Sequence, residues 1–427
     1  MVTLEAVLEQ ENLLRALKQV KANKGAPGVD GMKTDELVPY IKAHPNELRQ
    51  AIMDGTYRPS PVKRVYIPKE NGEKRPLGIP TVRDRLVQQA LAQKIAEEFE
   101  PKFSNNSYGF RPYRSALNAV QAVVRYANEG YEYVIDLDLS KFFDTVNHSK
   151  MIQVLSDTIK DGRVISLIHR FFQAKIEEDG KYTKPTQGMP QGGPLSPVCA
   201  NCLLNELDQE LEKRGHKFVR YADDMCVLLK SRRAAERAYE SIRKFIEKKL
   251  FLKVNTEKTK ICHLTEGIKF LGYTFYKGKN KDKGTYEWKP AIHKKSEKKF
   301  KNAIRVILDR RCPKGLEECK VTLRRFVVGW ANYFCLGMSK SRRKDLDSWI
   351  RRRIRQMYWK IWKKPRTRIR ALIRFGIGKD NAYQWGNSSK GYWRISDSWI
   401  LHRSLTVKRL SAEGRWTWLE NARQWQA

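Results

Sequence analysis

The chain of 427 residues carries 84 Lys and Arg against 47 Asp and Glu, which gives a formal net charge of +37, and 41% of its residues are hydrophobic. This hydrophobic content is enough for two or three folded domains and excludes a disordered polyelectrolyte. The positive charge far exceeds what solubility requires and predicts nucleic acid as the main partner.

Membrane insertion and secretion are not expected. No apolar run approaches the about 20 residues of a spanning helix. The N-terminus, "MVTLEAVLEQENLL", has early acids and a helical rhythm, which predicts a cytoplasmic protein. Seven cysteines, an odd number, predict reduced thiols. Cys199 and Cys202 form a C-x-x-C motif without a second ligand pair, so we expect core residues one helical turn apart rather than a zinc site.

The first part of the chain is predicted to be mostly helical. Apolar residues recur at near-helical spacing over residues 3–22, and "NKGAPGVDGM" then ends the pattern. A second helix is expected to run to about residue 53, with further helices over residues 82–100 and 115–129. Between them, "VKRVYIPKENGEKRPLGIP" alternates apolar and polar residues around an Asn-Gly pair, which predicts a β-hairpin.

The middle of the chain reads as a sheet that carries acids. "YEYVIDLDL" (131–139) predicts a buried strand with Asp136 and Asp138 near its end. "FVRYADDMCVLLK" predicts two strands that meet at Asp223 and Asp224. A helix is expected from the start of "SPVCANCLLNELD", and an amphipathic helix over "RAAERAYESIRKFIEKKL". "LKVN" and "IKFLGYTFY" are predicted as two further strands.

Basic helices replace the strands after about residue 290, which predicts a domain boundary there. In "SWIRRRIRQMYWKIWKKPRTRIR" apolar residues keep helical spacing while cations fill the other faces. A solvated helix surface is the alternative, but so many cations with few acids would repel one another, so we predict contact with nucleic acid. The cations concerned are Arg351, Arg352, Arg353, Arg355, Lys360, Lys363 and Lys364. The tryptophans in the last 55 residues, called the tail below, are expected mainly to pack a small domain and in part to stack on bases.

Asp223 and Asp224 stand at a tight turn between apolar strands, where two carboxylates cannot both stay ionised without a nearby cation. Asp138 adds a third carboxylate if the strands that carry these acids are neighbours in one sheet. Oxygen ligands of this kind favour Mg²⁺, and three acids on a rigid sheet suit two-metal phosphoryl transfer by a polymerase. An Asp-Asp pair alone is weak evidence, because surface turns also favour Asp.

The motifs form an ordered set that resembles reverse transcriptases. "YADD" resembles their catalytic box, and "YGFRPYRSALNAV", "VIDLDLSKFFD", "GMPQGGPLSPVCANCLLNELD", "LKVNTEKTKI" and "IKFLGYTF" resemble successive blocks of that family. "NKGAPGVDGM" and "VVGWANYF" (327–334) resemble the N-terminal extension and the thumb, or X, region of bacterial group II intron-encoded reverse transcriptases, also called maturases. The resemblance covers about residues 1–365.

This resemblance implies an α+β right-hand polymerase. We expect fingers, a palm with an antiparallel sheet backed by helices, an α-helical thumb, and a small basic C-terminal DNA-binding domain. The implied domains are an N-terminal extension (1–60), fingers and palm (61–292), thumb (293–365) and DNA-binding domain (366–427). Many relatives carry a C-terminal endonuclease with histidine and paired cysteines, whereas this chain has no cysteine after Cys335. We therefore expect no nuclease, as in the class IIC branch.

The resemblance also assigns the metal ligands. It implies that Asp138, Asp223 and Asp224 are catalytic and bind metal, with the backbone carbonyl of Leu139 as a further ligand. The implied cofactor is a pair of Mg²⁺ ions, with Mn²⁺ as a substitute.

Contacts with the incoming deoxynucleotide follow from the same resemblance. Phe143 would clash with a 2′-hydroxyl, although a core phenylalanine is the alternative. Gln191, in "PQGG", would contact the nucleotide. Lys69 and Arg75 would clamp its triphosphate, the alternative being ordinary exposed cations of the hairpin.

Two more positions and the partners complete the implied site. Lys258 resembles the lysine near the departing pyrophosphate, with neighbouring Lys260 as the alternative. Arg111, in "YGFRP", would position the template or the fingers. The implied partners are an RNA template, a DNA primer, deoxynucleotides, group II intron RNA and a DNA target, with no membrane.

Three functions remain open from the sequence. The chain is either an RNA-directed DNA polymerase that also assists splicing and retrohoming of its intron, or a maturase that acts in splicing only, or a reverse transcriptase domesticated for diversity generation, a retron or phage defence. Clustered acids facing a polyanion would not help a pure RNA binder, which argues against the second. The thumb block and the basic tail favour the intron over the third.

Overall fold

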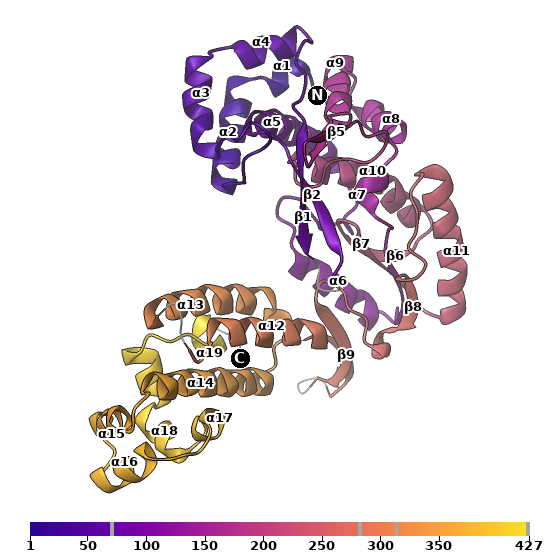
Figure 1. The fold of residues 1–427 in the computed structure, drawn as a ribbon. Helices are drawn as coiled ribbons and strands as arrows, with labels where there is room; N and C mark the ends of the chain where they lie inside the picture. Colours follow the sequence, from indigo (N-terminus) through magenta and orange to yellow (C-terminus); the bar gives the residue numbers. More distant parts are fainter. Residues whose placement is uncertain (69–71, 281–283, 312–314, 424–427) are drawn as a thin grey trace. The chain divides into compact units, whose positions relative to one another are not determined.

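The computed structural model describes residues 1–68, 72–280, 284–311 and 315–423, and the chain divides into two compact units, Met1–Glu266 and Gly267–Ala427 (Figure 1). Each unit has its own hydrophobic core. No helix in these ranges combines the length and the apolar character that a membrane crossing requires.

Helices form the N-terminal part of the first unit, shown in indigo in Figure 1. The single helix predicted over residues 3–22 is interrupted near Leu8. Buried Asn12 stabilises this break, because its side-chain nitrogen donates hydrogen bonds to the carbonyls of Val7 and Ala90 at 2.8 and 3.0 Å. The elements are α1 Leu4–Val7, α2 Gln10–Asn23, a 3₁₀ turn Thr34–Glu36, α3 Leu37–Ala43, α4 Glu47–Met53 and α5 Val82–Phe99.

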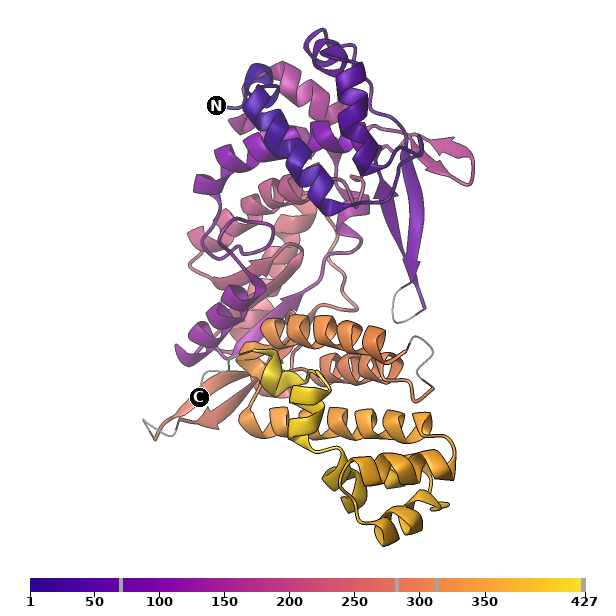
Figure 2. The ribbon, with the colours of Figure 1, turned by 90° about the vertical axis from the view of Figure 1, so that its left-hand side faces the viewer.

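The predicted hairpin forms one side of a four-stranded sheet with the order β2-β1-β4-β5 (Figure 2). Strand β1 (Val62–Pro68) pairs antiparallel with β2 (Lys74–Ile79). Strand β4 (Ile176–Glu178) pairs parallel with β1 and antiparallel with β5 (Lys181–Thr183). This sheet therefore joins segments that are distant in the sequence.

The second sheet of this unit has the order β6-β7-β3-β8, and all its strands run antiparallel. The predicted strand "LKVN" is not formed, since Val254 makes only an isolated bridge with Leu139. Cys199 and Cys202 lie buried in α10 (Leu195–Lys213), where burial raises the pKa of both thiols, as expected of core residues. The strands are β3 Tyr133–Leu137, β6 Lys217–Tyr221, β7 Asp224–Leu229 and β8 Lys260–His263.

Helices pack against this sheet and complete the core of the first unit. Helices α6, α10 and α11 contact its strands, and α8 packs against α9 and α10. Apolar residues on α11 recur at helical spacing and face the core, as the sequence predicts. The helices are α6 Ala116–Asn128, α7 Phe142–Thr145, α8 His148–Thr158, α9 Gly162–Phe172, α10 Leu195–Lys213 and α11 Arg232–Lys249.

The second unit consists of a hairpin followed by helices. The hairpin of β9 (Tyr273–Lys279) and β10 (Tyr286–Ile292) packs on these helices, because the Tyr273 hydroxyl donates to the carbonyl of Tyr333. The boundary between the two units therefore lies after Glu266, before the boundary predicted near residue 292. The division into four domains stays a prediction. The helices are α12 Lys294–Ile307, α13 Leu316–Tyr333, α14 Lys340–Ile361, α15 Pro365–Arg374, α16 Lys379–Gly386, α17 Tyr392–Ile395, α18 Trp399–Ser404, a π-helical turn Arg409–Glu413 and α19 Leu419–Ala422.

One hydrophobic core runs through the helices on both sides of residue 365. Helices α13 and α14 contact α19 near the end of the described chain. Asp347 on α14 accepts hydrogen bonds from the backbone nitrogens of Leu419 and Glu420 at 2.7 and 2.9 Å, and burial raises its pKa to about 6. The predicted thumb and the predicted tail therefore share buried contacts.

Candidate active site

The two predicted strands around "YADD" meet in a tight hairpin. Tyr221 pairs with Asp224, which leaves Ala222 and Asp223 as a two-residue turn between β6 and β7. Ala222 has a φ of 58°, in the left-handed region that such short turns require and that usually favours Gly or Asn. The hairpin thus presents Asp223 and Asp224 at its tip.

Asp138 comes from the strand beside this hairpin. Strand β3 pairs antiparallel with β7, with Leu137 opposite Met225, so Asp138 and Asp224 lie at the same end of the sheet. The backbone nitrogen of Asp138 donates a hydrogen bond to the Thr259 hydroxyl at 3.2 Å. The condition set by the sequence, that the acid-bearing strands be neighbours, is therefore met.

Asp136 is an additional acid of this cluster, and no metal role was predicted for it. It pairs with Cys226, and because side chains alternate along a strand, Asp136, Asp138 and Asp224 share one face of the sheet. Burial, followed by the charges of Asp224 and Asp138, raises the pKa of Asp136 to about 6, while Lys260 opposes the shift. The two-residue repeat of "DLD" is the sequence signal that places Asp136 on this face.

A divalent cation fits this cluster by charge and by donor chemistry. Burial and then the negative charges of Asp224 and Asp138 raise the pKa of Asp136, and a divalent cation would favour the charged form of that carboxyl. Carboxylate and carbonyl oxygens are the ligands that hard divalent cations prefer. Within the described ranges, no three His, Cys, Asp or Glu side chains already converge as a preformed metal site.

A cavity of about 290 Å³ is lined by two of the residues expected at the nucleotide site, Phe143 and Gln191. Arg75 joins them, because its Nε donates to Gln191 Oε1 at 2.9 Å. The backbone there is closely packed: Gly78 N donates to Gln191 O at 2.6 Å, and a Cβ at Gly192 would collide with the carbonyl of Gly78. Phe143, Gln191 and Arg75 are thus brought together from three segments.

Phe143 combines features of both of its expected roles. Its side chain is 9% exposed and belongs to the core of the first unit, yet it also lines the cavity. Its carbonyl accepts from Met189 N at 2.7 Å, which fixes its backbone beside the cavity wall. Neighbouring Phe142 packs edge-on against it at a ring distance of 5.1 Å and does not line the cavity.

The expected lysines differ in their surroundings. Lys258 is exposed, and its Nζ lies 3.9 Å from Asp138 Oδ2. Lys260 lies opposite Asp136 in the pairing of β8 with β3, and its charge lowers the pKa of the Asp136 carboxyl. Lys69 falls outside the described residues. The structure therefore brings one candidate lysine to each of two acids.

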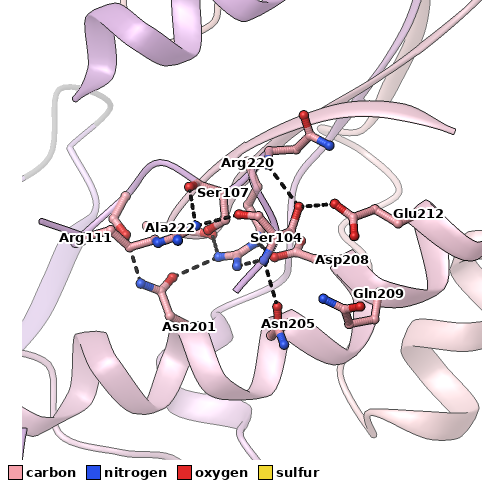
Figure 3. Close-up of polar contacts among 12 residues, drawn as sticks. Ser104, Ser107, Arg111, Asn201, Asn205, Asp208, Gln209, Glu212, Arg220 and Ala222 are labelled. Carbon is pink, nitrogen blue, oxygen red and sulfur yellow. Dashed lines mark hydrogen bonds and ion pairs between the residues drawn. The ribbon is translucent and has the colours of Figure 1, made fainter. Parts of the chain in front are cut away.

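Arg111 has an internal position. Its side chain is 3% exposed and forms an ion pair with Glu100 at 2.8 Å, and it also donates to the carbonyls of Ser104 and Ser107 (Figure 3). In this arrangement the guanidinium braces the loop of residues 104–111 and is buried from solvent. Of the two roles expected for Arg111, positioning the template or the fingers, this burial disfavours direct contact with the template.

The basic residues of α14 also depart from the expectation of an open cationic surface. Arg355 is 3% exposed, its Nε donates to the carbonyl of Leu405 at 3.2 Å, and burial lowers its pKa to about 10. Arg352 lies 3.9 Å from the ring of Trp393 and forms an ion pair with Asp397 at 3.0 Å. The segment after α14 packs on this helix, where it buries Arg355 and partly covers Arg352.

The other cations of this segment range from half-buried to exposed. Arg353 donates to the carbonyl of Leu308 at 3.1 Å, while Arg351 and Lys360 lie over the rings of Trp418 and Tyr392. Lys363 and Lys364, which follow the helix, are exposed. These two lysines are therefore the best placed of the seven cations for contact with nucleic acid.

Two family models match the chain. The model described as "Reverse transcriptase (RNA-dependent DNA polymerase)" matches residues 67–275 and so includes the acid cluster. The model described as "Group II intron, maturase-specific domain" matches residues 297–376 and includes α14. Reverse transcriptases as a family depend on divalent metal ions.

Several known proteins are similar to this chain. "Protein YkfC" of Escherichia coli (strain K12) is 34% identical over 310 residues, which cover 63% of this chain and 81% of YkfC. "Group II intron-encoded protein LtrA" of Lactococcus lactis is 31% identical over 323 residues, 60% of this chain and 54% of LtrA, so the chain spans about half of that relative.

Among solved structures, one chain of a partial Cas6-RT-Cas1–Cas2 complex is 22% identical, with a TM-score of 0.37, and the match covers 57% of this chain and 42% of that one. A likeness at this level carries no functional information. The two family models and the coverage of YkfC define the identity instead: this chain belongs to the group II intron-encoded reverse transcriptases, in which a polymerase fold is joined to a maturase domain.

Proposed function

We propose that this protein copies RNA into cDNA from a DNA primer and binds group II intron RNA to assist splicing and retrohoming into a DNA target. The observation that carries the proposal is the gathering of Asp136, Asp138 and Asp224 on one sheet face, next to the turn with Asp223. The proposed setting is the bacterial cytoplasm, and the proposed lineage is the class IIC branch.

Asp138, Asp223 and Asp224, with the carbonyl of Leu139, would hold two Mg²⁺ ions, or Mn²⁺ in their place. Bound there, the ions would activate the primer 3′-hydroxyl and stabilise the leaving pyrophosphate. Strand pairing keeps the acids on a rigid sheet, so little reorganisation is needed when the substrate arrives.

The remaining residues would bind and select the nucleotide. Arg75, held by Gln191, would donate to the triphosphate, and Lys258 would neutralise charge on the departing pyrophosphate. Lys69 has the same proposed role as Arg75. Phe143 would close the cavity wall against a 2′-hydroxyl.

Primer extension on a long RNA template tests the proposal. We expect the wild type to extend a DNA primer, while Asp223→Asn binds the template and primer but does not extend. Asp157→Asn is the matched control, because Asp157 is an exposed acid on α8. If wild type and both variants bind RNA equally and none extends, the splicing-only function replaces this proposal.

Nucleotide selection has its own test. Phe143→Ala should admit ribonucleotides, since the cavity wall would recede from the position of a 2′-hydroxyl. Phe142→Ala removes a neighbouring buried ring that does not line the cavity and should keep the selectivity. Unchanged selectivity in Phe143→Ala would assign Phe143 to the core alone.

The domesticated alternatives differ in the RNA that the protein serves. The match of the maturase-specific model to residues 297–376 favours the intron over diversity generation, a retron or phage defence. Splicing of a cognate intron RNA by the purified protein at low Mg²⁺ would distinguish them. Extension activity without any splicing assistance would favour the domesticated functions.

A further inference from the structure

A buried ion pair adjoins the turn that carries Asp223 (Figure 3). The side chains of Arg220 on β6 and Asp208 on α10 are 1% and 0% exposed. Arg220 Nε donates to Asp208 Oδ1 at 2.8 Å, and Nη2 donates to Oδ2 at 2.5 Å. This two-pronged geometry fixes the plane of the guanidinium.

The third nitrogen of this guanidinium, Nη1, contacts the turn formed by Ala222 and Asp223. Arg220 Nη1 donates to the carbonyl of Ala222 at 3.0 Å and to Asn201 Oδ1 at 2.9 Å. Ala222 has a left-handed backbone, which is unfavourable for a residue with a Cβ. Because the Ala222 carbonyl belongs to the peptide that leads into Asp223, the hydrogen bond fixes the start of the acid pair.

The loop of residues 104–111 holds the same turn from a second direction. Arg220 N donates to Asn106 O at 2.9 Å, and Tyr108 N donates to Arg220 O at 2.8 Å. Asn201 Nδ2 donates to the carbonyl of Gly109 at 2.8 Å. A Cβ at Gly109 would collide with the backbone nitrogen of Ala222. The turn therefore lies between a guanidinium and a loop that approaches closely only because it has glycine there.

We propose that Arg220, oriented by Asp208 and Asn201, is a positioning residue for the polymerase acids. Its hydrogen bond to Ala222 keeps the turn in the left-handed conformation that sets Asp223 and Asp224 against Asp138. This inference rests on the proposed function, in which these acids bind divalent cations. Arg220 itself touches neither substrate nor metal.

Both residues of the ion pair can be replaced together, so that no unpaired charge is left buried. Arg220→Met combined with Asp208→Leu substitutes apolar side chains of similar size, an exchange that folded proteins often tolerate. The double variant loses the donor to Ala222. The control is Arg214→Gln with Glu210→Gln, which removes an ion pair of 2.5 Å at the C-terminal end of α10, away from the turn.

The decisive measurement is Mn²⁺ binding by electron paramagnetic resonance of the free ion, without nucleotide or nucleic acid. Thermal unfolding and the rate of single-nucleotide incorporation at saturating dNTP accompany it. For the folded double variant we expect Mn²⁺ affinity to fall at least about fivefold and the rate about 10- to 100-fold, with apparent dNTP affinity little changed. A folded double variant with wild-type Mn²⁺ affinity and rate would overturn the proposal.

Gly109→Ala is an independent perturbation that keeps the ion pair and displaces Ala222. It should reproduce the loss of Mn²⁺ affinity and rate, and it decides the question if the double variant fails to fold. Gly162→Ala is its control, because no atom lies within 4 Å of a Cβ at that position. Wild-type behaviour of folded Gly109→Ala would also overturn the proposal.

The Mn²⁺ measurement separates this inference from the proposed function. A wild type that binds Mn²⁺ but extends no primer defeats the polymerase proposal, while the variants still decide whether Arg220 positions the acids. A wild type that binds Mn²⁺ no better than Asp223→Asn defeats both.

Discussion

The acid-bearing end of the sheet and helix α14 both concentrate charge of one sign, but they balance it differently. At the sheet, Asp138 and Asp224 help to raise the pKa of Asp136 to about 6. On α14, Arg352 has its own carboxylate partner, Asp397, at 3.0 Å and an aromatic ring at 3.9 Å. A carboxyl whose pKa is raised by burial and by neighbouring acids is typical of a functional site, whereas cations held by a carboxylate and an aromatic ring of the same unit stabilise the fold.

The largest effect is expected at the sheet. Asp138→Asn should slow extension at least about 10³-fold, roughly 4 kcal/mol of transition-state stabilisation, because the variant removes a proposed metal ligand. The free energy of unfolding should change by less than about 1 kcal/mol, since the variant removes repulsion along with an exposed ion pair to Lys258. Single-turnover extension and urea unfolding measure the two quantities. A large loss of stability would place Asp138 among structural charges.

Arg352→Gln should show the opposite pattern. It removes the ion pair to Asp397, a hydrogen bond to the carbonyl of Trp393 at 2.9 Å and the contact with the Trp393 ring. We expect the free energy of unfolding to fall by about 1–2 kcal/mol, with RNA affinity little changed. Unfolding and fluorescence anisotropy would check this. Weak RNA binding by a fully stable variant would contradict the structural role.

The exposed lysines after α14 should affect binding alone. Lys363→Gln with Lys364→Gln should lower RNA affinity roughly tenfold at low salt and reduce the salt slope of log K by about 1.5, because two phosphate contacts are lost. The melting temperature should not change. Lys248→Gln with Lys249→Gln on α11 removes the same charge from another exposed site. Equal losses in both pairs would show that only net charge matters.

The smallest effect is expected at Asp136. Asp136→Asn should raise the free energy of unfolding by about 1 kcal/mol in chelator, because it relieves repulsion and burial of charge. Added Mg²⁺ should then stabilise the variant less than the wild type. Thermal unfolding with and without Mg²⁺ measures this, with Asp157→Asn as the control. Equal Mg²⁺ stabilisation of both would separate Asp136 from the metal site.

Much of the site followed from local pattern. The apolar runs on both sides of Asp223 and Asp224 predicted the two strands, and antiparallel pairing then brought Asp138 to the same end. The alternation of side chains along the strand could predict that Asp136 shares a face with Asp138. The family motif assigns Asp136 no role, so the resemblance alone does not identify it. Strand period and motif carry different information.

Tertiary contacts explain what the sequence could not show. The helical pattern of α14 identifies one apolar face, but Arg355 is buried because residues around Leu405 pack on another face of the same helix. The partners Arg220 and Asp208 lie on a strand and a helix whose packing no local periodicity specifies. The sequence alone does not show whether a charged side chain is exposed to solvent, contacts a partner molecule or is buried with partners inside the fold.

The core shared by α13, α14 and α19 limits how chains of this kind can be recombined. Trp416 donates from its indole nitrogen to the Tyr358 hydroxyl at 3.2 Å, and Trp416 and Trp418 are buried with the apolar residues of α14. A tail exchanged at residue 365 would have to match the surface of α14 that these rings cover. Exchange of the segment after residue 365 as a simple module is therefore constrained, and this segment and α14 are expected to evolve together.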